Sequence, residues 1–116
     1  MKPFEKKEIE FEVAAADYAQ ALGGLLKKCV VPGERDWPDR IGLFPNAHTF
    51  YIEFKRPKEE PRRGQLANHK MLRRLGYSVY VCKSLDEAKQ IIDKEMEIAH
   101  VKSTKVHSSR LSENSN

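Results

Sequence analysis

Three side chains with complementary chemistry stand on either side of a turn-forming segment. Asp39 begins a short apolar run, and Glu53 and Lys55 lie near the end of the next run. Two carboxylates that share a small site repel each other, and a hard divalent cation bound by oxygen ligands is the usual means of neutralising them. A nearby ammonium group can orient an attacking water or stabilise charge on a phosphate. The trio therefore suits Mg²⁺-dependent hydrolysis of a phosphodiester.

A β-hairpin is needed to bring these groups together. Two strand-like runs, residues 40–44 and 49–55, flank the turn residues Pro45-Asn46-Ala47-His48. Counting outward from the turn brings Asp39 close to Glu53 across the strand pair. Strand side chains alternate, so Glu53 and the lysine two residues later share one face, expected to be polar, while the residues between them face the core.

The remaining elements follow from apolar spacing and from turn residues. We expect a helix from about Ile9 that ends at Gly23-Gly24, a strand over 25–31, a helix over 65–75, a strand over 77–82 and a helix opened by a Ser84–Glu87 capping box. In the second helix, Leu66, Leu72 and Leu75 are expected to face the core. The order α-β-β-β-α-β-α predicts one α/β domain over residues 1–102. Residues 103–116 lack apolar periodicity and are expected to form a disordered tail.

Composition limits the class of protein. With 116 residues, 40% hydrophobic and 33% charged, the chain suits one soluble globular domain. The net charge of +4 is moderate, but the basic residues cluster, so a polyanionic partner is plausible. The two cysteines lack the nearby partners of a zinc site and are expected to be reduced core thiols. No signal peptide or membrane span is evident, so we expect an intracellular, cytoplasmic protein.

Taken alone, an Asp at a strand start and a Glu-x-Lys on an exposed strand also occur by chance, and surface charges are as often solvated as bound. Further motifs change this balance, because they follow one another in a fixed order: Trp37-Pro38-Asp39-Arg40, Glu53-Phe54-Lys55-Arg56-Pro57, Pro61-Arg62-x-x-Gln65, Asn68-His69 and Leu72-Arg73-x-x-Gly76. In these motifs the chain resembles the VRR-NUC domains of the PD-(D/E)xK nuclease superfamily, from about Glu12 to Ala88.

The resemblance implies a fold and a site. The fold would be a restriction-endonuclease-like α/β core, with a central mixed β-sheet flanked by helices. The metal, Mg²⁺ with Mn²⁺ able to replace it, would be held by four residues: Glu12, Asp39, Glu53 and the backbone carbonyl of Phe54. Lys55 and Gln65 would complete the catalytic set with the two acids Asp39 and Glu53. Many family members have Gly where this chain has Asp36, which adds negative charge beside the site.

The expected substrate is DNA, bound through its phosphates. The residues assigned to this contact are Arg35, Arg40, Arg56, Lys58, Arg62, Arg63 and His69. Compact, phage-type members of the family resemble homodimeric Holliday-junction resolvases, which implies branched DNA, a homodimer and, for a phage protein, the host cytoplasm. A monomeric flap or nicking endonuclease and a DNA-binding module without catalysis are the alternatives. No organic cofactor and no membrane are expected.

Overall fold

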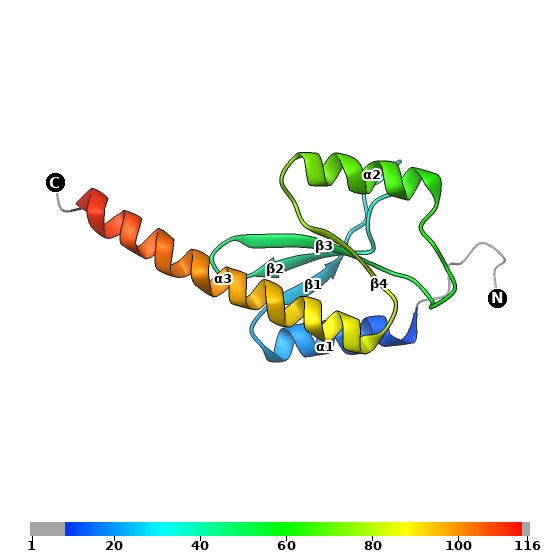
Figure 1. Cartoon of the computed structure of the whole chain (residues 1–116), viewed down its shortest axis with the longest axis horizontal. Helices are drawn as coiled ribbons and strands as arrows, with labels where there is room; N and C mark the ends of the chain where they lie inside the picture. Colours follow the sequence, from blue (N-terminus) through cyan, green and yellow to red (C-terminus); the bar gives the residue numbers. More distant parts are fainter. Residues whose placement is uncertain (1–8, 115–116) are drawn as a thin grey trace.

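The structure, a computed structural model, describes residues 9–114, and the side chains of residues 9–102. Seven elements follow in the predicted order: α1 (Glu10–Ala21), β1 (Leu25–Lys28), β2 (Arg40–Phe44), β3 (His48–Phe54), α2 (Arg63–Arg74), β4 (Val79–Cys82) and α3 (Leu85–Asn114). They form a mixed sheet flanked by helices on both faces (Figure 1), so the predicted α/β fold class is confirmed. The first eight residues of the predicted domain lie outside the described residues.

The four strands lie in the order β1-β2-β3-β4. The first three pair antiparallel, whereas β3 and β4 are parallel and are joined through α2. The turn between β2 and β3 places Asn46 and Ala47 at φ values of 64° and 59°. Two successive residues with positive φ give the backbone twist that suits a tight hairpin. The predicted hairpin is thus present, although Ala47 stands where glycine is usually favoured.

The two faces of the sheet are covered by different helices. α1 and α3 pack together on one face, over a buried core that includes Phe50, Ile52 and Phe54 of β3. The close approach of Phe50 to Gly42 on the neighbouring strand requires the glycine, because an added Cβ would lie 2.2 Å from the ring. α2 lies on the opposite face (Figure 1) and buries Leu72 and His69. Both faces of β3 are therefore covered.

A buried polar network fastens α3 to the sheet. Glu95 is fully buried and accepts hydrogen bonds from His48 Nε2 at 2.8 Å and from the Tyr80 hydroxyl at 2.7 Å. Lys102 Nζ lies 2.7 Å from His48 Nδ1 and can only donate, so the imidazole proton belongs on Nε2. Burial, followed by the neighbouring Glu95 carboxylate, raises the pKa of Tyr80. One carboxylate of α3 thus holds the first residue of β3 and the middle of β4.

The end of the chain differs from the prediction. α3 begins after Ser84, whose Oγ accepts the Glu87 N–H at 3.1 Å, and continues to Asn114 beyond the edge of the sheet (Figure 1). The prediction of a disordered tail is therefore wrong for residues 103–114. Apolar periodicity ends there, but no Gly or Pro follows Gly76 that would stop the helix. Residues 115–116 lie outside the described residues.

The remaining general predictions concern the cysteines and the membrane. Cys82 is fully buried and Cys29 is partly buried, and both are free thiols. Burial raises the pKa of Cys82 to about 11. The cysteine prediction is confirmed for Cys82, while Cys29 is only partly enclosed. Among the helices that the structure describes, none combines the length and the apolar character needed to span a membrane.

Candidate active site

The hairpin register sets Asp39 against Glu53. Arg40 pairs with Ile52, and the next step outward brings Asp39 to the level of Glu53. Asp39 Oδ2 accepts the backbone N–H of Phe54 at 2.7 Å. Asp39, the residue before β2 begins, is therefore hydrogen-bonded to β3, the strand that carries Glu53. The predicted closeness of the two acidic residues is confirmed.

Glu53 is enclosed between β3 and α2. Its side chain is fully buried, and Oε1 lies 3.2 Å from Nε2 of His69, which is also fully buried. Lys55 is 5% exposed, and its Nζ lies 3.8 Å from Glu53 Oε2, too far for a hydrogen bond. Oε2 itself has no hydrogen-bond partner. A buried carboxylate oxygen without a partner is costly, so this atom is suited to a cation or to a bound water.

The donor set fits a hard divalent cation in part. Mg²⁺ is usually held by one or two carboxylates, with water and substrate phosphate completing its shell. Asp39 and Glu53 meet that need, and the strongest sign of it is the buried Glu53 Oε2, which has an ion pair with Lys55 but no hydrogen-bond partner. Within the described part of the chain, no three His, Cys, Asp or Glu side chains form a group that could hold a metal ion. A metal here would depend on solvent and substrate for its other ligands.

Glu12 and Arg40 lie on the other face of the sheet from Glu53. Arg40 Nε donates to Glu12 Oε2 at 2.7 Å, and Arg40 NH1 donates to the Leu26 carbonyl at 2.8 Å. Arg40 is only 8% exposed, and its guanidinium neutralises a buried carboxylate, so its burial lends no support to a DNA contact, which stays a prediction. Glu12 is placed beside Arg40, not in a group with both acids, and its role as a metal ligand stays a prediction.

α2 carries two further residues singled out in the sequence. Gln65 is 2% exposed, and its Oε1 accepts the backbone N–H of Arg62 at 2.7 Å, which caps the start of the helix. Its catalytic role stays a prediction. His69 is fully buried against Glu53, which lends no support to a DNA contact, and that assignment stays a prediction. The sequence signal for this buried contact was the four-residue spacing that puts His69 and Gln65 on one helix face.

Phe54 has two roles that its position between Glu53 and Lys55 concealed. Its ring belongs to the core on the α1 side and makes an edge contact with Phe11 at 5.7 Å between ring centroids. Its N–H, described above, holds Asp39. The role of its carbonyl oxygen as a metal ligand stays a prediction.

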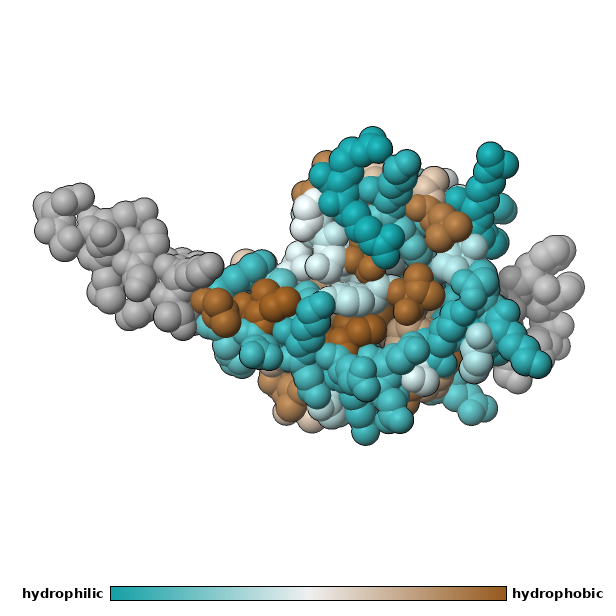
Figure 2. All heavy atoms as spheres, viewed as in Figure 1, coloured by the Kyte–Doolittle hydropathy of each residue, from teal (hydrophilic) through white to brown (hydrophobic). Residues whose placement is uncertain are grey.

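The other five residues assigned to DNA are exposed: Arg35, Arg56, Lys58, Arg62 and Arg63. Two of them form surface ion pairs, Arg56 with Glu59 at 3.0 Å and Arg62 with Asp36 at 3.4 Å. The backbone N–H and then the guanidinium of Arg56 hold the pKa of Glu59 below its usual value. Hydrophilic side chains project over α2 on the visible face (Figure 2). Exposure leaves these cations accessible to phosphates.

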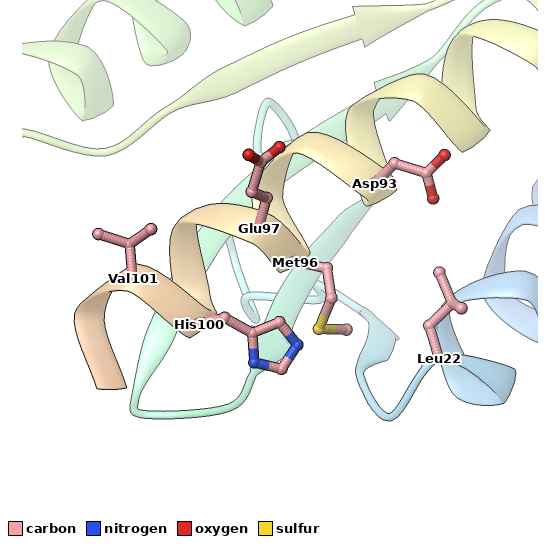
Figure 3. A pocket seen from close by; sticks show the side chains of 6 residues that line it. All are labelled: Leu22, Asp93, Met96, Glu97, His100 and Val101. Carbon is pink, nitrogen blue, oxygen red and sulfur yellow. The ribbon is translucent and has the colours of Figure 1, made fainter. Parts of the chain in front are cut away.

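A cavity of about 500 Å³ lies away from the acidic residues and the exposed cations. It is lined by Leu22 at the end of α1 and by residues of α3, among them Met96, His100 and Val101 (Figure 3). Both helices cover the sheet face opposite α2, so this cavity is separated by the sheet from the Glu53 side chain. Its lining is mainly apolar, and it contributes nothing to the acidic site.

Comparisons with known proteins agree with this geometry. A protein of Acyrthosiphon pisum secondary endosymbiont phage 1, named "Putative nuclease p44", is 36% identical over 80 residues, which cover 69% of this chain and 86% of the phage protein. A solved structure described as a VRR_NUC domain matches with a TM-score of 0.68 and 27% identity, over 72% of this chain and 91% of that one. No family model matches the chain.

Proposed function

This chain belongs to the VRR-NUC family of nucleases, and we propose that it is a Mg²⁺-dependent endonuclease that cleaves branched DNA. The observation that carries the proposal is the buried Oε2 of Glu53, which has no hydrogen-bond partner and forms only a long ion pair with Lys55 Nζ, at 3.8 Å, while Asp39 is fixed beside the same strand. These are the groups that hydrolysis of a phosphodiester requires: oxygen ligands for a cation and a positive charge next to them.

The metal ligands in this proposal are the carboxylates of Asp39 and Glu53 and the carbonyl oxygen of Phe54. A bound Mg²⁺ or Mn²⁺ supplies Lewis-acid stabilisation of charge on the phosphate oxygens. His69 acts as a positioning residue, because its Nε2–H fixes one oxygen of Glu53 and leaves the other free to bind. Gln65 holds the first turn of the helix that carries His69.

Lys55 has the part closest to the reaction. A water attacks phosphorus and loses a proton to solvent, the bond from phosphorus to the leaving oxygen breaks, and that oxygen takes up a proton from solvent. The ammonium group of Lys55 orients the water and offsets negative charge on the phosphate as it builds. Because Lys55 is 5% exposed, the charge acts in a poorly solvated setting, where its field is weakly screened.

Among branched DNAs, we propose the four-way Holliday junction as the substrate and a homodimer as the active species. One site cuts one strand, so two symmetric cuts need two copies, and a two-fold dimer presents two sites to a two-fold substrate. The exposed cations Arg35, Arg56, Lys58, Arg62 and Arg63 would contact phosphates without reading base sequence. Recognition would therefore depend on DNA shape.

Cleavage of defined DNAs tests this function. Wild type, Asp39→Asn and the matched control Glu97→Gln, which removes an exposed carboxylate on α3, are incubated with four-way junction, flap and linear duplex DNA, in Mg²⁺, in Mn²⁺ and with chelator. We expect paired, symmetric junction cuts that need metal, are lost in Asp39→Asn and persist in Glu97→Gln. The mass of the protein in solution should be that of a dimer.

Other outcomes separate the alternatives. If a monomer cuts flap DNA and leaves the four-way junction intact, the protein is a flap or nicking endonuclease and not a junction resolvase. Binding of all three DNAs without cleavage in either metal would reject catalysis and leave a DNA-binding module. Calorimetric titration of Mn²⁺ into wild type and Glu53→Gln gives a readout that does not depend on cleavage, and the variant should bind at least about 100-fold more weakly.

A further inference from the structure

A cavity of about 460 Å³ lies beside the acidic site, between the loop at residues 33–37 and α2. Trp37 on the loop stands two residues before Asp39, and Asn68 on α2 directly precedes His69, which contacts Glu53. Both walls of the cavity therefore continue into the segments that position the acids. Its volume falls in the range of small-molecule pockets, about 300–1,000 Å³, and suits one nucleotide unit.

Two polar atoms of the cavity walls have no partners. Nε1 of Trp37 is buried and makes no hydrogen bond, and the same holds for Oδ1 of Asn68. One is a donor and the other an acceptor. Buried polar atoms are paired in the great majority of cases, so two exceptions on side chains that line one cavity point to a ligand with complementary donors and acceptors. Both atoms are buried in this structure, so their side chains must turn toward the cavity to meet it. The Trp37 ring also packs against Tyr51 of β3, with 6.2 Å between the ring centroids and an interplanar angle of 50°.

The charges of the cavity favour a base over a phosphate inside it. Asp36 lies against the first turn of α2, so closely that a Cβ on Gly64 would stand 2.2 Å from its Oδ2. An anion thus already occupies the position where a helix N-terminus would attract a phosphate. The guanidinium groups of Arg35 and Arg62 flank Asp36 at 4.0 Å and 3.4 Å, with side chains 83% and 52% exposed. They are placed to meet phosphates at the rim.

From this arrangement we propose that the cavity receives one unpaired nucleobase of the DNA, next to the phosphate that is cut. The inference rests on the proposed nuclease function and specifies how that site selects its substrate. Taking a base out of a duplex costs its pairing and stacking, and this cost is smallest for a base that is already single-stranded, as beside a flap. In a four-way junction, one base pair at the centre would have to open to supply such a base. Shape selection would then come from the availability of an unpaired nucleotide, read by stacking and by the polar atoms of Trp37 and Asn68.

Trp37 is the single tryptophan of the chain and reports on the cavity directly. Its fluorescence is measured while the metal-free protein, in chelator, is titrated with flap DNA that carries either a base or an abasic residue at the unpaired position nearest the branch. We expect the base to quench Trp37 and to tighten binding about 5- to 150-fold, as stacking of one base does. Equal affinity and equal quenching for the two DNAs would overturn the proposal.

Two variants locate the effect. Ala67→Phe fills the cavity from α2, and Leu66→Phe places the same aromatic ring at the preceding residue, which is 52% exposed and does not line the cavity. Ala67→Phe should abolish the preference for the base, and Leu66→Phe should keep it; a preference that survives Ala67→Phe would reject the cavity. Should Ala67→Phe fail to fold, Asn68→Ala removes the unpartnered acceptor and should weaken the preference, and an unchanged preference would again reject it.

The two proposals fail in different ways. If the protein cuts branched DNA with Mg²⁺ but does not distinguish base from abasic DNA, the base pocket is rejected and the nuclease function stands. If the protein shows base-dependent quenching but cuts no DNA, the base pocket stands and the catalytic assignment is rejected.

Discussion

The carboxylate of Asp39 accepts the backbone N–H of Phe54 at 2.7 Å, so the acid that precedes β2 is tied to the strand that carries Glu53 and Lys55. A side chain here takes the place of a ladder hydrogen bond at the end of the hairpin. The spacing of the two acids is thus set by the hairpin itself and does not depend on a flexible loop. Asp39 thus has two roles: its oxygen accepts a hydrogen bond that holds the hairpin, and its negative charge is proposed to bind the metal. Different substitutions can test the two roles separately.

Asp39→Asn should retain the fold and lose cleavage. The amide oxygen still accepts the Phe54 N–H, so the free energy of unfolding should change by less than about 1 kcal/mol. Loss of the charge should lower the cleavage rate by at least about 100-fold, since even a partner of a metal ligand is worth 10- to 100-fold. Asp39→Ala should lose about 1.5–3 kcal/mol as well, because the hydrogen bond goes. Urea unfolding measures the stability of the two variants, and single-turnover kinetics measure their cleavage rates. Equal stability of Asp39→Asn and Asp39→Ala would contradict the structural role of the hydrogen bond.

His69→Gln and His69→Ala distinguish positioning from packing. Gln retains a donor toward Glu53 and should keep most of the stability and the Mn²⁺ affinity. Ala removes the hydrogen bond that His69 makes to the buried Glu53 carboxylate and opens a cavity, so it should destabilise the fold by about 3 kcal/mol or more. Thermal unfolding and calorimetric Mn²⁺ titration provide the readouts. If His69→Gln binds Mn²⁺ as weakly as His69→Ala, the hydrogen bond to Glu53 is not what positions the carboxylate.

The Glu12–Arg40 pair is open to a double-mutant cycle. Glu12→Leu and Arg40→Met each remove one side of a buried ion pair and should cost about 3–5 kcal/mol, whereas the double variant should cost much less than the sum. Mn²⁺ titration of the same proteins tests the metal-ligand prediction for Glu12. We expect the double variant to bind Mn²⁺ like wild type. A double variant that regains stability but not Mn²⁺ affinity would place Glu12 among the ligands.

The two thiols should differ in reactivity. Burial raises the pKa of Cys82 to about 11, against about 8.5 for an unfolded cysteine, so at pH 8 only about one in a thousand Cys82 side chains is thiolate. With iodoacetamide at pH 8, mass spectrometry should find Cys29 labelled first and Cys82 labelled only after unfolding in urea. Equal labelling of both in the native protein would contradict the enclosure of Cys82.

The same shift has a consequence for stability. A pKa raised by folding means that the native state holds its proton longer than the unfolded state. The contribution of Cys82 is complete below the unfolded pKa and is lost as the pH rises toward 11. Urea midpoints measured between pH 8 and 11 should therefore fall with pH, and less steeply in Cys82→Ala than in wild type. A parallel fall in both proteins would assign the loss to other groups.

The hairpin and the order of elements could be predicted because they depend on local signals. Turn residues and strand alternation placed Asp39 near Glu53, and Ser84 marked the start of α3. The exposure of β3 could not be predicted in this way. Alternation assigned Glu53 and Lys55 to a polar face, but α2 covers that face and leaves them 0% and 5% exposed.

Predictions that depended on what packs against a residue were less successful. Leu66 and Leu75 were expected in the core with Leu72, yet they are 52% and 67% exposed, because α2 buries Gln65, His69 and Leu72. Arg40 was read as a surface cation, since nothing in its neighbourhood along the chain shows that Glu12 reaches it from α1. Such partners are far apart in sequence and are visible only in the folded chain.

The parallel pairing of β3 with β4 has one more consequence. β3, α2 and β4 form a single uninterrupted segment, residues 48–82, and that segment contains Glu53, Lys55, Gln65 and His69. The buried charge and the helix that shelters it thus come from one crossover unit, so sheltering needs no distant part of the chain. Of the residues predicted to be catalytic, only Asp39 lies outside this segment, directly before the neighbouring strand β2. The segment is a natural unit to transplant: grafted onto another sheet with an acid at the matching edge, it would bring its own enclosure.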